Sequence, residues 1–282
     1  MEHKGFWITL AALACLGVYL FASAPPPLAE TKPTAASIPV TEMFAVLEAA
    51  NDQMRLMWAR DFVGEGKKVG LKFDEHWRDA DLEAGPLPAQ FLRETAKSLE
   101  KNPSPLSLYL GSDYPINPAN RFEGAQLERF QILRRNREPQ FFYMADTRLQ
   151  VGMFEDVAFA EPCIQCHNQH PQSPKGDWAM QDVMGATTWM YPEPAVSPEE
   201  LVRTLAALQQ GFEEAYAVYL EKVKGFAQPP AVGRQWPRDG YSIPDAATFR
   251  QEIIARTAPG TLQSLVALTA ARSRELAHAS TP

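Results

Sequence analysis

Two cysteines and a histidine lie within five residues near the middle of the chain, in the run Cys163-Ile164-Gln165-Cys166-His167. A C-x-x-C-H run is typical of c-type haem attachment, because two thiols at this spacing form thioether bonds with the vinyl groups of the porphyrin. The histidine that follows offers its imidazole to the iron as proximal ligand. The sequence therefore predicts one covalent haem c held by Cys163 and Cys166, with His167 on the iron.

Three other roles for these cysteines are weaker predictions. A thioredoxin-like motif belongs to a βαβ unit and does not need the histidine that follows. A zinc site could use Cys163, Cys166, His167 and His170, but structural zinc sites usually draw on two separated ligand pairs. A disulfide between the two is the third alternative, since the only other cysteine, Cys15, lies in an apolar N-terminal segment.

The motif leaves the second axial ligand of the iron open. Met57 and Met54 share one face of a predicted helix, and a thioether ligand would raise the reduction potential of the haem. His76 is the other histidine between the N-terminal segment and the motif, and a second imidazole would lower that potential. We rank Met57 first, then Met54, then His76, and an open sixth position is a further alternative.

The residues after the motif are expected to form a loop against the haem. His170 lies three residues beyond His167 and is expected to make hydrogen bonds within this loop rather than bind iron. Lys175, Asp177 and Trp178 are expected to fold the loop back. We therefore count His170, Lys175 and Trp178 among the residues at the cofactor.

No catalytic set is recognisable in the sequence, which has no G-x-S-x-G, phosphate-loop or H-E-x-x-H motif and no second C-x-x-C-H. Carboxylates such as Asp74-Glu75 and Glu213-Glu214 are expected at the solvated surface. Arg134, Arg135 and Arg137 are expected on a solvated helix end, where one of them could meet a haem propionate. We expect that the protein is not an enzyme.

The N-terminal segment predicts export. Residues 6–24 are uncharged and mostly apolar, and a helix of this length is about 28 Å long, close to the roughly 30 Å of a bilayer core. Cleaved signals have apolar regions of about 7 to 15 residues, and Pro25 follows the only A-x-A site. We therefore favour an uncleaved anchor at residues 1–24 over a cleaved signal, with Lys4 in the cytoplasm and the rest on the periplasmic side of a bacterial inner membrane.

Residues 25–40 are rich in proline and predict an extended spacer. About 240 residues remain, enough for one large domain or for a domain with a helical extension. Loss of Glu2 and Lys4 with the first 24 residues would leave the net charge of −7 unchanged. An acidic body argues against a nucleic-acid partner and allows steering toward a basic redox partner.

Hydrophobic periodicity predicts helices at both ends of the exported part and strands between them. The predicted helices run from a Thr41 cap to near Gly64 or Gly66, from Pro88 to Asn102, over 127–137, over 198–225, over 245–257 and over 260–278. The predicted strands cover 106–110, 141–144, 149–154 and 183–190, with a hairpin turn at Asp146-Thr147. This order predicts an α+β fold with a small antiparallel sheet.

Two segments of the chain share a short pattern, in which a helix leads to a tryptophan with Arg and Asp nearby and then to a helix containing Phe and Glu. The first has Trp77-Arg78-Asp79 with Phe91 and Glu94, and the second has Trp236-Pro237-Arg238-Asp239 with Phe249 and Glu252. The pattern raises the hypothesis of an internal repeat.

Residues 41 to 190 resemble the monohaem c-type, PAS-like domain family, which forms periplasmic sensor regions of histidine kinases and nucleotide cyclases and also small stand-alone haem proteins. The resemblance is strongest over 163–178, Asp182-Val183 and Gly185, with weaker support at 86–89 and 112–115. It implies a PAS-like antiparallel sheet flanked by N-terminal helices, with haem between sheet and helix. The haem domain would then cover 41–192, and 193–282 would be a helical extension.

The chain departs from the family pattern in two respects. Relatives can use a cysteine of the N-terminal helix as sixth iron ligand, and this chain has none there. Sensor relatives continue into a second membrane span and a cytoplasmic catalytic domain, whereas this sequence ends at Pro282. We therefore expect no output domain of its own.

The sequence thus predicts a membrane-anchored periplasmic monohaem c-type protein that passes or holds single electrons, docked to a larger membrane complex through its helical tail. The alternative is a haem-based redox or gas sensor that acts through a separate partner protein. A structural subunit braced by haem is a third reading.

Overall fold

The computed structural model describes residues 37–237 and 242–279, within one compact unit that begins at Ser37. The predicted anchor at 1–24 and most of the predicted spacer at 25–40 lie outside the described residues. In the described part, no helix has both the length and the apolar composition needed to cross a membrane.

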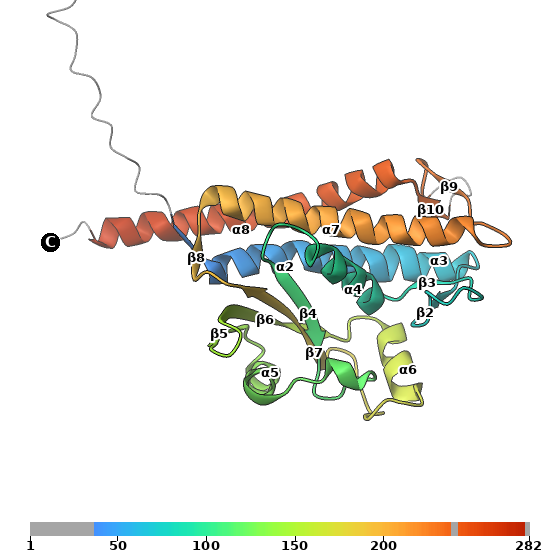
Figure 1. Cartoon of the computed structure of the whole chain (residues 1–282), viewed down its shortest axis with the longest axis horizontal. Helices are drawn as coiled ribbons and strands as arrows, with labels where there is room; N and C mark the ends of the chain where they lie inside the picture. The colour runs from blue at the N-terminus through green and yellow to red at the C-terminus, as the bar shows by residue number, and fades with distance from the viewer. Residues whose placement is uncertain (1–36, 238–241, 280–282) are drawn as a thin grey trace, which may run out of the picture. The chain divides into compact units, whose positions relative to one another are not determined.

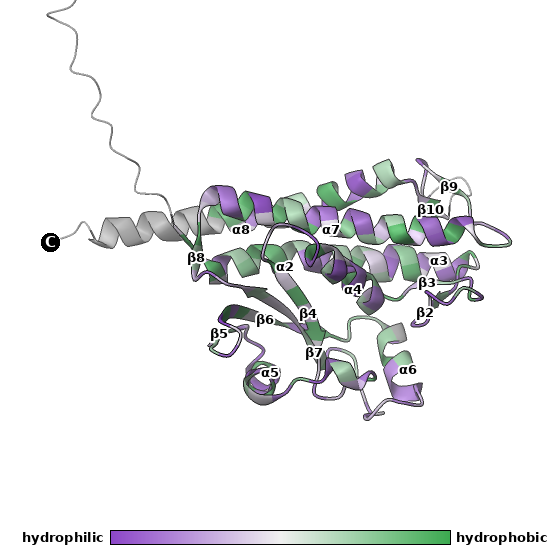
Figure 2. Ribbon diagram, viewed as in Figure 1, coloured by the Kyte–Doolittle hydropathy of each residue, from purple (hydrophilic) through white to green (hydrophobic). Residues whose placement is uncertain are grey.

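Long helices form a bundle that carries most of the core (Figure 1). They are α2 (Val40–Met57), which continues as the π-helical η1 (Trp58–Gly64) and α3 (Glu65–Lys68), and α4 (Pro88–Leu99), α7 (Pro198–Lys224) and α8 (Ala246–Ala279). In this bundle α4 packs along α7, and α2 packs along α8. Colouring by hydropathy shows apolar residues along these helices (Figure 2). The segment predicted as a helical extension therefore shares its core with the N-terminal helices.

The start of α2 differs from the prediction. Thr41 was expected as the cap, but the helix begins at Val40 after Pro39, with no side-chain hydrogen bond at its N-terminus. Strand β1 (Ile38–Pro39) pairs with β8 (Ala195–Val196), so the chain is already fixed before Thr41. At α7, by contrast, Ser197 caps the helix by accepting a hydrogen bond from the Glu200 amide at 3.1 Å.

A four-stranded antiparallel sheet lies below the bundle in Figure 1. Its order is β4 (Ser107–Gly111), β7 (Val183–Tyr191), β6 (Leu149–Val157) and β5 (Gln140–Met144). Helix α5 (Gly124–Asn136) packs against it through Phe130 and Leu133, and α2 contacts β6 and β7. These elements confirm the α+β class and the predicted antiparallel sheet, while its PAS-like character stays a prediction.

Close packing of α2 on this sheet depends on a glycine. A Cβ atom placed on Gly152 of β6 would lie 2.6 Å from the ring of Phe44, too close for any side chain there. Only glycine lets the two backbones approach so closely.

The predicted internal repeat is visible in the hydrogen bonds of the bundle. Two parallel strand pairs have the same design: β2 (Phe73–Asp74) with β3 (Gly85–Pro86), and β9 (Val232–Gly233) with β10 (Ile243–Pro244). The Trp58 indole donates to the Pro86 carbonyl oxygen at 2.9 Å, and the Tyr216 hydroxyl donates to the Pro244 carbonyl oxygen at 2.6 Å. Both bonds join residues 28 positions apart.

Aromatic stacking repeats in the same register. Trp58 stacks on Phe91 with ring centroids 4.0 Å apart, and Tyr216 stacks on Phe249 at 3.8 Å. The two stacks meet edge to face through Trp58 with Tyr216 and Phe91 with Phe249. A shift of 158 residues, from 58 to 216 and from 91 to 249, relates a first helical hairpin, α2 to α4, to a second, α7 with α8. These matched features support the repeat, while Arg238 and Asp239 of the second predicted segment lie outside the described residues.

The prediction of two separate C-terminal helices was wrong. Helix α8 is continuous from Ala246 to Ala279 and contains Pro259 in its interior. Proline removes one backbone donor and usually kinks or ends a helix. Packing of one face of α8 along α2 outweighs this local preference, since most helical stability in proteins comes from tertiary packing.

Candidate haem-attachment site

A short helix that the sequence analysis did not predict carries the haem motif. Helix α6 (Glu161–Gln169) follows β6 and begins after Ala160 with a proline in its first turn. Residues three and four apart share one face of a helix. Cys163, Cys166 and His167 have this spacing, so α6 presents both thiols and the imidazole on a single side.

Both thiols of the motif are free, and Cys166 is exposed. Cys163 is half-buried and packs with Ile164 against Trp178. Burial raises the pKa of both thiols above the usual value for cysteine. Redox-active cysteines have lowered pKa values. The connection from antiparallel β6 through α6 to β7 also differs from a βαβ unit, so the thioredoxin-like alternative gains no support.

His167 is suited to bind a metal ion. Burial lowers its pKa, which favours the neutral imidazole that coordinates iron. Its Nδ1 atom is buried and has no hydrogen-bond partner in the part of the chain that the structure describes. The residues present therefore fit a haem group: two neutral thiols for the vinyl groups, and beside them an imidazole whose Nδ1 has no partner among the described residues.

His170 is held by other contacts. Its Nε2 lies 2.6 Å from Oε1 of Glu75, and its Nδ1 accepts a hydrogen bond from the Gln172 amide at 3.1 Å. Both ring nitrogens are thus in use, one of them within the loop as predicted. Glu75 was expected at the solvated surface; its side chain is 32% exposed and has a specific partner in His170. It ties the β2–β3 loop to the haem loop, 95 residues along the chain.

The loop after α6 folds back through paired hydrogen bonds. The Asn168 side chain donates to the Trp178 carbonyl oxygen at 2.9 Å and accepts from the Trp178 amide at 2.8 Å. Lys175 lies over the Trp178 ring, 4.6 Å from its centroid, and pairs with Asp177. Trp178 is buried with its indole nitrogen unpartnered in the described part. Whether Lys175 and Trp178 contact the cofactor stays a prediction.

Two of the three arginines predicted at the end of α5 form ion pairs, and Arg135 is exposed. Arg134 pairs with Asp113, and Arg137 donates to the Gln181 carbonyl oxygen at 2.8 Å and pairs with Glu155 at 2.6 Å. With the haem loop they line a depression of about 290 Å³, whose walls are Arg134, Arg137, Lys175, Trp178, Asp182 and Val183.

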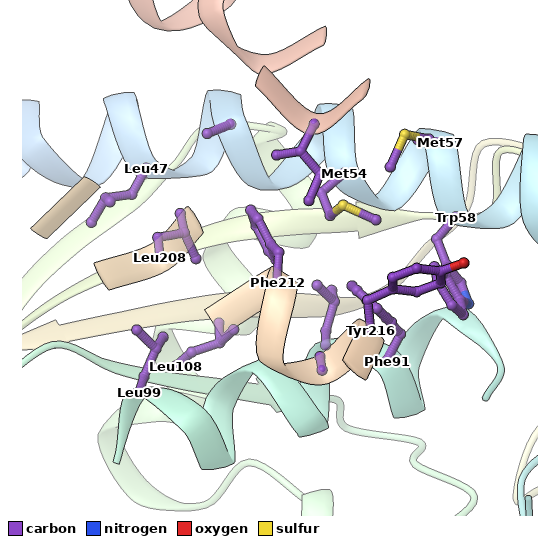
Figure 3. Close-up of a cluster of buried hydrophobic side chains, with 14 of the residues drawn as sticks. Leu47, Met54, Met57, Trp58, Phe91, Leu99, Leu108, Leu208, Phe212 and Tyr216 are labelled. Atoms are coloured by element: carbon purple, nitrogen blue, oxygen red, sulfur yellow. The ribbon is translucent and has the colours of Figure 1, made fainter. Parts of the chain in front are cut away.

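The three predicted distal ligands have different surroundings. Met54 and Met57 are each 1% exposed and lie in the bundle core, as Figure 3 shows. The repeat relates them to Phe212 and Ala215, two buried residues of α7. His76 has a side chain 71% exposed, with Nε2 3.6 Å from Glu75. Iron coordination by any of the three stays a prediction.

A charged group on α2 lies near the motif and was missed by sequence reasoning. Arg55, whose side chain is 9% exposed, pairs with Asp156 of β6 and with Asp52 at 3.3 Å. Burial alone would lower the pKa of Arg55. The acidic groups of Asp156, Asp52 and Glu48 outweigh this effect and raise the pKa above its usual value. The charges of Asp156 and Arg55 both act on Cys163. Asp52 and Arg55 alone resemble an ordinary surface pair, so no local pattern revealed this cluster.

The zinc alternative lacks a ligand set. Within 37–237 and 242–279, no three His, Cys, Asp or Glu side chains come together in a group that could hold a metal ion.

Comparison with known proteins adds the family. No curated protein and no solved structure matches the chain. A family model described as Tll0287-like matches residues 30–192, which is more than half of the 282 residues and includes the motif on α6. The chain therefore belongs to the Tll0287-like family of monohaem c-type cytochrome-like domains, as the sequence resemblance predicted.

Proposed function

We propose that the chain binds one haem c covalently through Cys163 and Cys166 and serves as a single-electron carrier, with His167 as the axial ligand of the iron. The observation that carries this proposal is the common face of α6, where two neutral thiols lie beside a neutral imidazole. Bound haem would supply a one-electron iron couple. We also propose that the protein is not an enzyme.

The residues around α6 would each have a defined task at such a group. Asn168 and Trp178 hold the loop after the helix, so the direction of the motif is fixed. Glu75 fixes the ring of His170 and thereby joins the loop to the bundle. Cys163 and Ile164 pack against the buried cluster of Ala158, Trp178 and Met184, which places apolar side chains on one side of the attachment point. A rigid, partly dry site suits electron transfer because little has to reorganise.

The location is part of the same proposal. An uncleaved apolar anchor at 1–24 would hold the described unit on the periplasmic side of the inner membrane, beside a membrane complex or a redox partner. The net charge of −7 favours a partner with a basic docking surface.

The test is the purified native protein and its Cys163→Ser, Cys166→Ser double variant. Intact mass and a pyridine haemochrome spectrum should show one covalent haem in the native chain. The double variant should carry none after denaturation. A native chain without added tetrapyrrole would reject the proposal. Met57→Leu and Met54→Leu then test the distal ligand, since loss of the far-red sulfur-to-iron band would identify a thioether on the iron, and an unchanged band would exclude the substituted methionine.

A sensor is the second candidate, favoured by the burial of Met54 and Met57 in the bundle and the exposure of His76. If these residues stay where they are, the distal side of the iron is open to small molecules. Carbon monoxide separates the two functions: ready binding to the reduced protein supports sensing, and an unchanged spectrum supports electron transfer.

A further inference from the structure

One carboxyl group is buried between the bundle and the sheet, and the ion pair of Arg55 with Asp156 lies between it and the proposed haem site. Glu48 on α2 is 5% exposed. Its Oε2 accepts hydrogen bonds from the indole of Trp189 at 2.7 Å and from the side-chain amide of Asn51 at 3.3 Å. Its Oε1 is buried with no partner among the described residues. An ionised carboxylate would leave this oxygen charged and unsatisfied, whereas a protonated carboxyl lowers that cost.

Other charges decide when Glu48 ionises. Asp52 and Arg55 face it from its own helix and Asp156 faces it from β6, so two acids and one guanidinium surround it, while β7 provides the Trp189 donor. Burial and then Asp52 raise the pKa of Glu48 to about 8, against the opposing effects of Arg55 and the Trp189 hydrogen bond. The carboxyl is therefore mostly neutral at pH 7 and ionises slightly above it.

The charged groups around Glu48 also act on residues of the haem motif. Asp156 acts electrostatically on Cys163 and on His167, and Arg55, which pairs with Asp156, acts on Cys163. Where the effective dielectric constant is low, a change of one unit of charge alters the energy of charged groups several ångströms away. A change of one charge at an iron bound to His167 would therefore alter the energy of an ionised Glu48.

We propose that Glu48 is a redox-linked proton site: it takes up one proton from solvent when the bound haem accepts one electron from a one-electron donor, and it releases that proton on reoxidation. This inference rests on the proposed haem function. Reduction removes one positive charge near the carboxylate, so the protonated form becomes more favourable. By the same linkage, the reduction potential falls as pH rises through the range in which Glu48 titrates.

The chain offers a matched control. Glu94 on α4 is also buried, but Arg78 and Lys97 donate hydrogen bonds to its carboxylate at 2.9 and 3.0 Å. Burial alone would raise the pKa of Glu94, and these partners lower it below its usual value. Glu94 thus stays ionised in both oxidation states. Glu94→Gln changes a buried glutamate without changing a redox-linked proton.

The experiment measures the midpoint potential of the full-length haem-loaded protein between pH 6 and 10, for the native chain, Glu48→Gln and Glu94→Gln. In the native chain and in Glu94→Gln, the potential should fall with pH around pH 8, by at most about 59 mV per tenfold change in proton concentration. Glu48→Gln should be flat over that range. Equal slopes in all three proteins, or no slope in the native chain, would overturn the inference.

Two further measurements keep the test decisive if Glu48→Gln does not fold. Native protein titrated with a one-electron reductant in weak buffer should take up protons near pH 8, up to one per electron. Trp189→Phe removes a hydrogen bond that lowers the Glu48 pKa, so the sloping range should move to higher pH. No proton uptake, or an unmoved range, would reject the role of Glu48. Absence of haem in the pyridine spectrum would instead reject the proposed function itself.

Discussion

The two helical hairpins of the bundle have the same internal design and different outer faces. Both place an aromatic stack over a parallel strand pair, Trp58 on Phe91 in the first hairpin and Tyr216 on Phe249 in the second. On the face of α2 toward the sheet, however, the first hairpin carries charged residues. The shift of 158 relates Glu48, Asp52 and Arg55 of α2 to Ala206, Gln210 and Glu213 of α7.

This difference separates the positions that stabilise the common core from those that lie at the candidate site. Positions inside the bundle remain apolar in both copies, so either copy serves the common core equally well. Positions on the face of α2 toward the sheet hold three charged residues in the copy next to the haem motif and one, Glu213, in the other copy. A duplicated scaffold can thus acquire a site on one copy without disturbing the interior that both copies share.

The largest expected effect tests whether the buried aromatic stacks of the two hairpins contribute equally to stability. Phe91→Ala and Phe249→Ala each remove a fully buried ring from matching stacks, and each should lower the free energy of unfolding by about 3 to 5 kcal/mol. Urea denaturation measures both. Ile254→Ala, at an exposed position of α8, should change little. A loss in one stack of less than half that in the other would break the equivalence of the hairpins.

The pH dependence of stability should come from the first hairpin. The folded-state pKa of Glu48 is about 8, above its usual value of 4.5, so the folded protein binds more protons than the unfolded chain between these values. Stability should therefore fall as pH rises from about 4.5 to 8, by at most about 1.4 kcal/mol per pH unit from this group. Denaturation curves of Glu48→Gln should lack this slope.

The contribution of Glu94 to stability, which Glu94→Gln removes, changes with pH in the opposite direction. The pKa of Glu94 is lowered in the folded state, so its contribution is present above the unfolded pKa and is lost as pH falls through the folded value. Equal pH slopes for the native chain and Glu48→Gln would show that Glu48 is not the titrating group.

Matched arginine substitutions should separate the two outer faces. Arg55→Met breaks a nearly buried pair with Asp156, and we expect a loss of about 2 kcal/mol, below the range for fully buried pairs because Asp156 is partly exposed. Arg250→Met breaks a pair with Glu213 in which the arginine is 62% exposed, and the loss should stay under about 1 kcal/mol. Thermal and urea unfolding measure both, and similar losses would contradict the distinction.

The smallest effect concerns the link between the first hairpin and the haem loop. Glu75→Gln weakens the contact with His170 and should cost about 1 kcal/mol, with faster proteolytic cleavage between 170 and 178. Glu65→Gln disturbs only the exposed pair with Lys68 and serves as the control. Cleavage at the same rate in both variants would show that Glu75 does not hold the loop.

Much of the fold could be predicted from the sequence because it follows local periodicity. The apolar spacing of α7 and the alternation of residue types predicted over 106–110 locate α7 and β4 within a few residues. Helix α6 was missed because Cys163 to His167 is short and has no apolar stripe. The continuity of α8 through Pro259 depends on contacts with α2, which no local rule includes.

The candidate site also has a part that could be predicted from the sequence and a part that could not. The motif on α6 was predictable because its chemistry requires adjacent residues. Two pairs at the site join distant parts of the chain: Glu75 with His170, 95 positions apart, and Arg55 with Asp156, 101 positions apart. Each of these residues alone is of a type that is common at protein surfaces. Such pairs become visible only when the fold brings their elements together.

Because α4 packs along α7 and α2 along α8, the order of the helices limits how the protein can be divided. A fragment ending at Pro192 would keep the motif and the sheet but lose the two helices that cover Met54, Trp58 and Phe91. That fragment would expose a broad aromatic surface to water and would aggregate or recruit a substitute for the missing half. Recombinant production therefore needs boundaries drawn outside both hairpins.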